Sequence, residues 1–357
     1  MVADTAAAIF GILIILVVAA DIFRSLLVPR ANARLLRVGP LLGTVLFSGW
    51  QAAARRIGPV RLRQTMRASL APLILVLTLV IWAGSLIVGF GLLFWADRAN
   101  FKPGFATIGD AFYAAGSAFS TLGISGTVSG DLTRIAVLIC SVSGLAIVTV
   151  VATFLISIQA GFARRETLVL RLESHVTLPP AGIAILETYA GEGVVHRLGP
   201  FFEAWELWAT EVAISHRAFP ILLFFRSNDS RCEWLAAWGA VLDAAALLDA
   251  AIADAPAEAR AGAHFVLRTG ARVLADMAEQ FAKAGDDPTL ADRKRFTDHL
   301  DRLSAVGYQL IDDKAAALDC FFKLRRTYAG PLVTLARRLD IDVDERTGDD
   351  VDSQPYR

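Results

Sequence analysis

The segment from Thr107 to Gly130 holds the residues whose types and order could do chemistry. A short charge-free run, Ala111–Ser120, leads directly into Thr121, Leu122, Gly123, Ile124, Ser125 and Gly126. Glycines and small residues at this point take the backbone out of a helix, and unpaired backbone is tolerated at membrane depth only where it lines water or protein. Exposed peptide carbonyls can replace the water shell of a cation. The chemistry expected here is ion coordination by backbone oxygens, with one hydroxyl from Thr121.

The run before this loop is typical of a short helix. Thr107 and Asp110 stand three residues apart at its start, as in a capping box with aspartate in place of glutamate. The helix makes about three turns, which is about half of the ~30 Å hydrocarbon core of a bilayer. Such a helix enters the membrane without crossing it, and its C-terminal end directs a partial negative charge at the loop.

Three longer apolar segments supply the membrane spans that must hold this loop. They are Ala6–Val28, Leu70–Trp95 and Leu132–Ile158, each long enough to cross the hydrocarbon core. The chain is 55% hydrophobic with a mean hydropathy of +0.51, which is too apolar for a soluble protein of 357 residues. A cleavable signal peptide is the competing interpretation of the first segment, but the segment lacks the basic region and cleavage site of such peptides.

Basic residues orient these spans. Residues 1–165 hold 14 Lys and Arg against 5 Asp and Glu, whereas the rest of the chain holds 21 against 30. The connection between the first two spans is rich in arginine and has no acidic residue, and the next connection has only Arg98 and Lys102 as basic residues. The positive-inside rule therefore places the N-terminus outside and the C-terminal half in the cytoplasm. Within the first connection, Leu41–Trp50 is predicted to be a helix lying on the membrane surface.

A span, a half-length helix, a Thr-x-Gly loop and a further span together resemble the pore module of the potassium-channel superfamily. The whole chain is similar to a bacterial potassium channel family with three spans, a single pore loop and a helical cytoplasmic tail. The segments that carry this resemblance are Asp21–Arg30, Ala111–Gly126, Gly161–Glu166, Leu178–Pro180, His216–Ser227 and Trp234–Leu247.

The resemblance implies an ion channel of the cell inner membrane, a multi-pass protein that conducts a monovalent cation, K⁺, and holds no other cofactor. One chain supplies one loop, so four chains must surround the axis to close a ring of carbonyls. A homotetramer in the lipid bilayer is therefore expected.

The loop departs from the superfamily filter, which reads Thr-Val-Gly-Tyr-Gly and is followed by an acidic residue. Thr121 and Gly123 match it, and Leu122 is a mild change. Ile124 replaces the aromatic residue whose hydroxyl braces the filter, and Ser125 replaces the second glycine, where a side chain is strained. Ser125 therefore either holds strain or lets the filter relax. These changes predict weakened potassium selectivity.

Gly144 lies in the third apolar segment, about twenty residues after Gly123. The resemblance implies that a glycine at this depth acts as a gating hinge. The alternative is that a residue without a side chain allows two helices to pack closely.

The chain is predicted to be an all-α membrane protein with four parts. Residues 1–69 form the first span and the basic segment, residues 70–162 the pore domain, residues 163–339 a helical cytoplasmic domain, and residues 340–357 an acidic disordered tail. The helices predicted in the cytoplasmic domain are Ala163–Ser174, Ala181–Ala190, Phe201–Ala218, Cys232–Ala253, Ala257–Lys283, Leu290–Leu324 and Pro331–Leu339.

The cytoplasmic half shows no sequence pattern of a catalytic, cofactor-binding or metal site. The glycine-rich nucleotide loops and the EF-hand loop are absent. Its histidines have no ligand spacing, and the three cysteines of the chain form no CxxC pair. An enzyme is therefore not expected, nothing indicates a nucleic-acid partner, and the sequence names no cytoplasmic partner.

These patterns bear on three functions from different classes. A cation channel uses the filter-like loop directly. A non-conducting membrane sensor or scaffold would keep the pore fold after the filter decayed, and the loss of the second glycine and of the acidic residue favours it. A membrane-anchored enzyme has the least support, because no nucleophile–base pair is recognisable in the cytoplasmic half.

Overall fold

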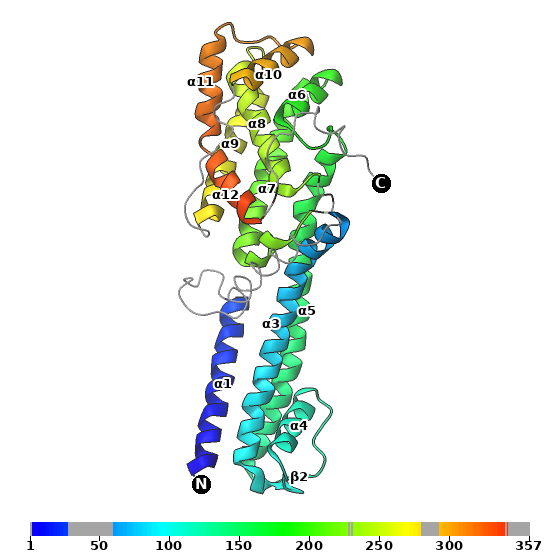
Figure 1. Cartoon of the computed structure of the whole chain (residues 1–357), viewed down its shortest axis with the longest axis vertical. Coiled ribbons are helices and arrows are strands. Elements are labelled where there is room, and N and C mark those ends of the chain that lie inside the picture. Colours follow the sequence, from blue (N-terminus) through cyan, green and yellow to red (C-terminus); the bar gives the residue numbers. More distant parts are fainter. Residues whose placement is uncertain are drawn as a thin grey trace. The chain divides into compact units, whose positions relative to one another are not determined.

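The computed structural model describes residues 2–27, 60–227, 229, 231–279, 293–339 and 341, and almost all of these residues are helical or in short connections (Figure 1). The predicted surface helix Leu41–Trp50 and, apart from Ile341, the predicted tail over residues 340–357 lie outside the described residues.

The chain divides into two compact units, residues 1–159 and residues 160–357. The first unit contains α1 (Val2–Leu27), α3 (Val60–Ala96), η1 (Arg98–Asn100), β1 (Phe101–Lys102), α4 (Ile108–Phe119) and β2 (Thr127–Val128). The two strands pair antiparallel, with Phe101 opposite Val128. Helix α5 (Asp131–Glu173) begins in the first unit and continues into the second.

The second unit contains the remaining helices. They are α6 (Gly182–Gly191), η2 (Val195–Arg197), α7 (Leu198–Ala218), η3 (Pro220–Phe224), α8 (Trp234–Ala251), α9 (Ala257–Ala278), α10 (Arg293–Ala305), α11 (Lys314–Arg325) and α12 (Ala329–Leu339). Helix α8 forms the centre of this unit and contacts α6, α9 and α11. Its Trp238 ring meets the Trp208 ring of α7 edge-on, with centroids 5.2 Å apart.

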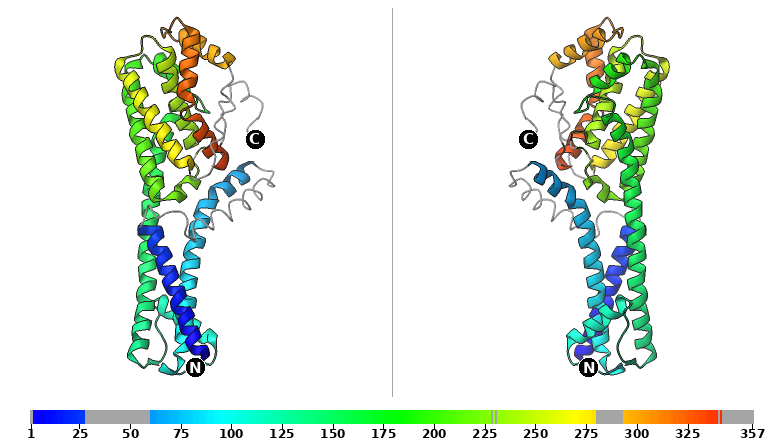
Figure 2. Two further views of the ribbon diagram at one scale, coloured as in Figure 1. Left: turned by 90° about the vertical axis from the view of Figure 1, so that its left-hand side faces the viewer. Right: turned by 90° about the vertical axis from the view of Figure 1, so that its right-hand side faces the viewer.

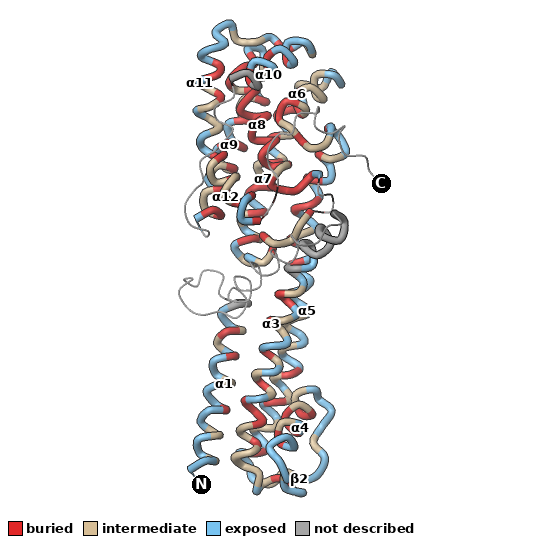
Figure 3. The backbone as a smooth tube through the Cα atoms, viewed as in Figure 1, coloured by how far each residue is buried: buried red, intermediate tan, exposed pale blue. Residues whose placement is uncertain are grey.

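Among the residues that the structure describes, four helices are long and apolar enough to cross a membrane, namely α1, α3, α5 and α8. They differ in how much of the apolar window is buried within the protein. That share is 11% in α1, 33% in α3 and 17% in α5, but 89% in α8. Figure 3 shows this contrast as mostly exposed residues on α1 and almost continuous burial on α8. The chain is an all-α membrane protein with several candidate spans.

Helices α1 and α3 pack closely through small residues. A Cβ added at Gly11 would lie 2.5 Å from the carbonyl oxygen of Gly89, so a side chain at this position would force the helices apart. Further along the pair, Trp82 Nε1 donates to Asp21 Oδ2 at 2.8 Å, and Asp21 is only 8% exposed. This bond gives one carboxylate oxygen of Asp21 a partner, which reduces the free-energy cost of placing an acidic side chain in apolar surroundings.

The prediction of two separate helices around residues 159–162 was wrong. The predicted span Leu132–Ile158 and the predicted helix Ala163–Ser174 form one continuous helix, α5. No proline interrupts this stretch, and one glycine inside a helix lowers its stability by only ~1 kcal/mol. At Gly161 an added Cβ would lie 3.0 Å from Leu222 Cδ1, so the glycine serves close packing against η3.

The predicted helix Leu290–Leu324 was also wrong, because α10 and α11 are separate. Gly307 takes a left-handed conformation with φ 97°, which ends the first helix. The following segment pairs with the end of α8, where Ile311 N donates to Ala251 O at 2.9 Å. Asp313 then caps α11 by accepting from the amides of Ala315 and Ala316. The bond between Ile311 and Ala251 joins distant parts of the sequence, so no local sequence pattern could reveal it.

Candidate functional site

The candidate site is the end of α4 and the loop after it, and it begins with a well-formed helix start. Thr107 Oγ1 accepts from Asp110 N, and Asp110 Oδ2 accepts from Thr107 N at 2.7 Å. This reciprocal pair confirms the predicted capping box. Asp110 also accepts from Ala106 N at 2.9 Å, which fixes the chain entering the helix.

Helix α4 lies between α3 and α5, as the views in Figure 2 show. On the α3 side, a Cβ added at Gly91 would lie 1.9 Å from the Phe112 ring, so the ring occupies the space above the glycine. On the α5 side, the Cys140 thiol lies 3.5 Å from Ala115 O. The buried residues of α4 are all small, and they are Ala111, Ala114, Ala115, Ser117 and Ala118. Small side chains allow the short helix to sit deep between the two longer ones.

Gly144 of α5 lies directly against the last turn of α4. A Cβ added at Gly144 would be 1.8 Å from Phe119 O and 2.8 Å from Phe119 C. Helix α5 continues without a break through this position. Close packing therefore explains why a glycine stands here. The predicted hinge is a separate property and stays a prediction.

The C-terminal end of α4 turns into the loop through a Schellman arrangement. Leu122 N donates to Ser117 O at 2.9 Å, and Thr121 N donates to Ala118 O at 3.0 Å. The turning residue is Thr121, with φ 62°. Glycine usually occupies this place because a β-branched residue is strained there. Backbone strain of this kind is concentrated at functional sites, so it marks Thr121 as a position of interest.

The loop exposes backbone carbonyl oxygens together with the Leu122 side chain. Residues 121–123 are exposed, Leu122 is 78% exposed, and nothing lies within 4 Å of a Cβ built on Gly123. Within the described part of the chain, no hydrogen bond is donated to the carbonyl oxygens of Thr121, Leu122 and Ile124. The Gly123 oxygen differs, because Ser117 Oγ donates to it.

The rest of the loop is held against the protein. Ile124 packs against the apolar core of the first unit. Ser125 does not take a left-handed backbone, so it holds no strain of that kind. Gly126 does, with φ 108°, and a Cβ there would lie 2.2 Å from Lys102 O. The pairing of β1 and β2 thus ties the returning strand of the loop to the segment before α4.

A polar network that the sequence did not reveal joins the nearby ends of α3 and α5. Asn100 Nδ2 donates to Asp97 Oδ1 at 2.8 Å and lies 3.2 Å from Thr133 Oγ1, and Thr133 donates to Asp97 Oδ2. Ser129 N and Oγ both donate to Asn100 O. The network fixes the distance between the two helices that hold α4. Only the cluster of short polar residues around positions 97–100 and 129–133 signals it in the sequence.

In the second unit the most deeply buried charge is Arg165, on the C-terminal part of α5. Its guanidinium group donates to Glu166 Oε1 and to the carbonyl oxygens of Leu222 and Phe225, at 2.8–3.0 Å. It also lies 5.0 Å from the centroid of the Trp234 ring. Burial lowers the pKa of Arg165, while the charge of Glu166 raises it. Its contacts anchor this end of α5 to η3 and α8.

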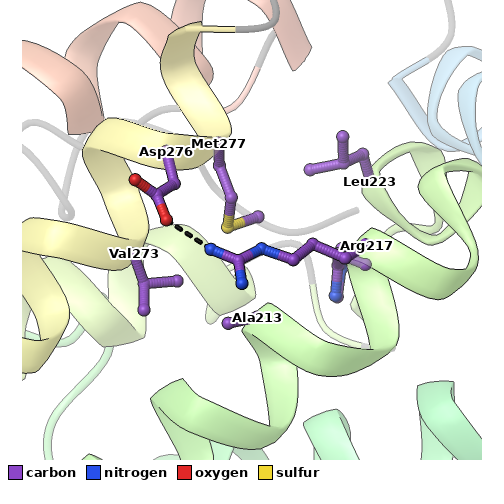
Figure 4. A pocket seen from close by; sticks show the side chains of 7 residues that line it. Ala213, Arg217, Leu223, Val273, Asp276 and Met277 are labelled. Atoms are coloured by element: carbon purple, nitrogen blue, oxygen red, sulfur yellow. Dashed lines mark hydrogen bonds and ion pairs between the residues drawn. The ribbon is translucent and has the colours of Figure 1, made fainter. Parts of the chain in front are cut away.

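A small pocket in the same unit offers no chemistry of its own. Figure 4 shows it between α7, η3 and α9, with lining residues Ala213, His216, Arg217, Leu223, Val273, Asp276 and Met277. Arg217 and Asp276 form an ion pair across it, drawn dashed. Burial, and next the charge of Arg165, lower the pKa of His216 to about 3, so this histidine is neutral at pH 7. Arg217 and Asp276 engage each other, and an imidazole with so low a pKa is a weak base.

Among the residues that the structure describes, no group of three or more His, Cys, Asp or Glu side chains is placed to hold a metal ion. Comparison with known proteins finds no family model, no curated protein and no solved structure that matches this chain. The geometry of the α4 loop is therefore the basis for any functional proposal.

Proposed function

We propose that the chain is one subunit of a potassium-channel-like cation channel, a homotetramer of the cell inner membrane. In this proposal α1, α3 and α5 are its three spans, with the N-terminus outside and the second unit in the cytoplasm. Helix α4 is the re-entrant pore helix. Four copies of residues 121–126 surround a central path, through which a monovalent cation passes with weakened selectivity for K⁺.

One observation carries this proposal. A capped helix of 12 residues, half the length of a span, sits between two long apolar helices and ends in an exposed loop. Three carbonyl oxygens of that loop, those of Thr121, Leu122 and Ile124, accept no hydrogen bond from any described residue of the chain. Free carbonyls beside the negative end of a helix form the environment that a dehydrated cation requires.

Burial supports three spans rather than four. Helix α8 is covered by its neighbours and carries Asp243, which accepts from Tyr328 Oη and forms an ion pair with Arg325 at 3.3 Å. A helix that is apolar all round and already covered by protein is typical of the core of a large domain. We therefore assign α8 to the cytoplasmic domain.

The alternative, a non-conducting membrane sensor or scaffold that retains the pore fold, is favoured by one specific contact. The Ser117 hydroxyl donates to Gly123 O, the central carbonyl of the loop. A carbonyl that is engaged inside the chain offers less of its negative charge to an ion.

Potassium flux from liposomes tests the proposal. Reconstituted wild-type protein is expected to dissipate a K⁺ gradient. Gly123→Val is expected to abolish this flux, because valine at φ 97° distorts the loop. Gly307→Val is the matched control. Gly307 has the same φ of 97° and the same open surroundings, but lies in the second unit. A wild-type protein that retains the gradient favours the non-conducting alternative.

A further inference from the structure

Two neighbouring helices of the second unit each expose a face that no described residue of the chain covers. On α7, Leu207 and Ile214 are 63% and 65% exposed and stand seven residues apart, which places them on the same side of the helix. On α5, Leu170 is 56% exposed. Single exposed apolar residues are normal on soluble surfaces. Leu207 and Ile214 repeat on one side of α7, and Leu170 adds a third exposed apolar side chain on the adjacent helix, which together indicate a contact surface.

The charges beside these apolar residues have opposite signs on the two helices. The α7 face carries Glu203 and Glu211, both exposed, on either side of Leu207. On α5, Arg164 and Arg171 stand seven residues apart on one side of the helix and are also exposed, and Leu170 lies about 100° around the helix from Arg171. At 1.5 Å rise per residue, the two glutamates are separated by about 12 Å and the two arginines by about 10.5 Å along their helix axes. An acidic helix face and a basic helix face of matching length are therefore present on the same chain.

These four charges do not pair with one another, although the two helices are neighbours. Helices α5 and α7 touch through Trp208 Nε1, which donates to Arg165 O at 2.8 Å, and a Cβ on Gly161 would lie 3.5 Å from Ser215 Cβ. None of Arg164, Arg171, Glu203 and Glu211 forms a salt bridge with another residue that the structure describes. The charged faces are thus available to a partner.

We propose that this surface binds a second copy of the chain, with the α7 face of one copy against the α5 face of the next. The proposal rests on the proposed tetramer, because a ring of identical subunits needs two different complementary patches on each chain. The basic α5 face and the acidic α7 face provide such a pair. Leu170, Leu207 and Ile214 supply the apolar contact, and the charges set the orientation and the choice of partner.

Two full-length variants with exchanged charges test this contact. Variant A carries Arg164→Glu and Arg171→Glu, and variant B carries Glu203→Arg and Glu211→Arg. Either variant alone places like charges at every contact between copies. In a mixture that alternates A and B around the ring, every contact again joins opposite charges. Contacts within one chain cannot be repaired by mixing, so the mixture distinguishes contacts between copies from contacts inside one copy.

Disulfide cross-linking detects the proposed contact between the α5 face of one copy and the α7 face of the next. Leu170→Cys and Leu207→Cys are placed on separately tagged copies in a Cys320→Ser background, so that a disulfide between the two tags reports the proposed neighbours. With native charges we expect a cross-linked product. We expect about tenfold less when both copies carry the A charges or both carry the B charges, and recovery when A charges accompany Leu170→Cys and B charges accompany Leu207→Cys. Arg268→Glu with Arg272→Glu, an exposed arginine pair on α9, is the control and should leave the product unchanged.

The outcomes separate this inference from the channel proposal. Equal cross-linking with native, A and B charges overturns the contact surface, and so does a loss that mixing does not restore. If tetramer size and K⁺ flux persist in that case, the channel proposal stands without it. A wild-type protein that is monomeric in detergent and shows no K⁺ flux in liposomes overturns both the contact surface and the channel proposal.

Discussion

At the scale of single residues, the Ser117 hydroxyl donates to the Gly123 carbonyl and, in the proposed channel, determines how much of that oxygen is available to an ion. We expect Ser117→Ala to raise K⁺ flux about fivefold, because it removes one neutral hydrogen bond from that oxygen. Ser120→Ala is the control, since Ser120 donates to a helix carbonyl, Ser117 O, and not to the loop. Equal flux from wild type and Ser117→Ala would show that this bond does not limit permeation.

His216 predicts a pH dependence of stability in the second unit. In the unfolded chain this histidine takes up a proton near its ordinary pKa of 6.5, whereas in the folded protein it does so only at about 3. Protonation therefore favours the unfolded state as the pH falls from 6.5 towards 3, by up to about 1.4 kcal/mol per pH unit. We expect His216→Phe to reduce the loss of thermal stability between pH 7 and pH 5. His175→Phe, at an exposed position, should keep the wild-type loss, and an unchanged loss in His216→Phe would contradict the assignment.

Residue patterns predicted part of the candidate site. The capping box of Thr107 and Asp110 was predicted correctly because it depends on two residues three positions apart. The choice between strain and relaxation at Ser125 could not be made from the sequence. It depends on Gly126 and on the distant Lys102, which the β1–β2 pairing brings together. The bond from Ser117 to Gly123 was missed because serines in apolar helices usually bond to their own helix.

At the scale of elements, the contact between α4 and α5 predicts a clear difference between two glycines. Gly144→Ala should lower the free energy of unfolding of the detergent-solubilised protein by about 1–3 kcal/mol, because its Cβ would collide with Phe119 O. Gly84→Ala on α3 has nothing within 4 Å of the added Cβ and should be neutral or stabilising. Equal stability of both variants would mean that α4 does not rest on Gly144.

The bounds of the elements show what sequence patterns can and cannot reveal. Helix α4 was predicted closely because a capping box starts it and a glycine-containing run follows it. The continuity of α5 was missed because Gly161 resembles a helix end, although close packing against Leu222 explains it. The break between α10 and α11 was missed because Ala251 and Ile311 bond across 60 positions of sequence, and no local pattern encodes such a bond.

At the scale of the whole molecule, composition predicted an all-α membrane protein, and the structure agrees. Hydropathy alone does not separate α8 from a span, since its apolar window passes the same criterion as those of α1, α3 and α5. The proposal of three spans rests on burial, which is a property of the folded unit and is 89% for the α8 window.

The most direct test of the central claim is K⁺ flux from assemblies that mix wild-type and Gly123→Val chains in known ratios. If four loops close one path, a single altered loop blocks it, and flux follows the fourth power of the wild-type fraction. An equal mixture should then retain about one-sixteenth of the wild-type flux. Mixtures with Gly307→Val should retain all of it. A linear decrease with Gly123→Val would contradict a path shared by four chains, and no decrease would contradict any role of the loop in permeation.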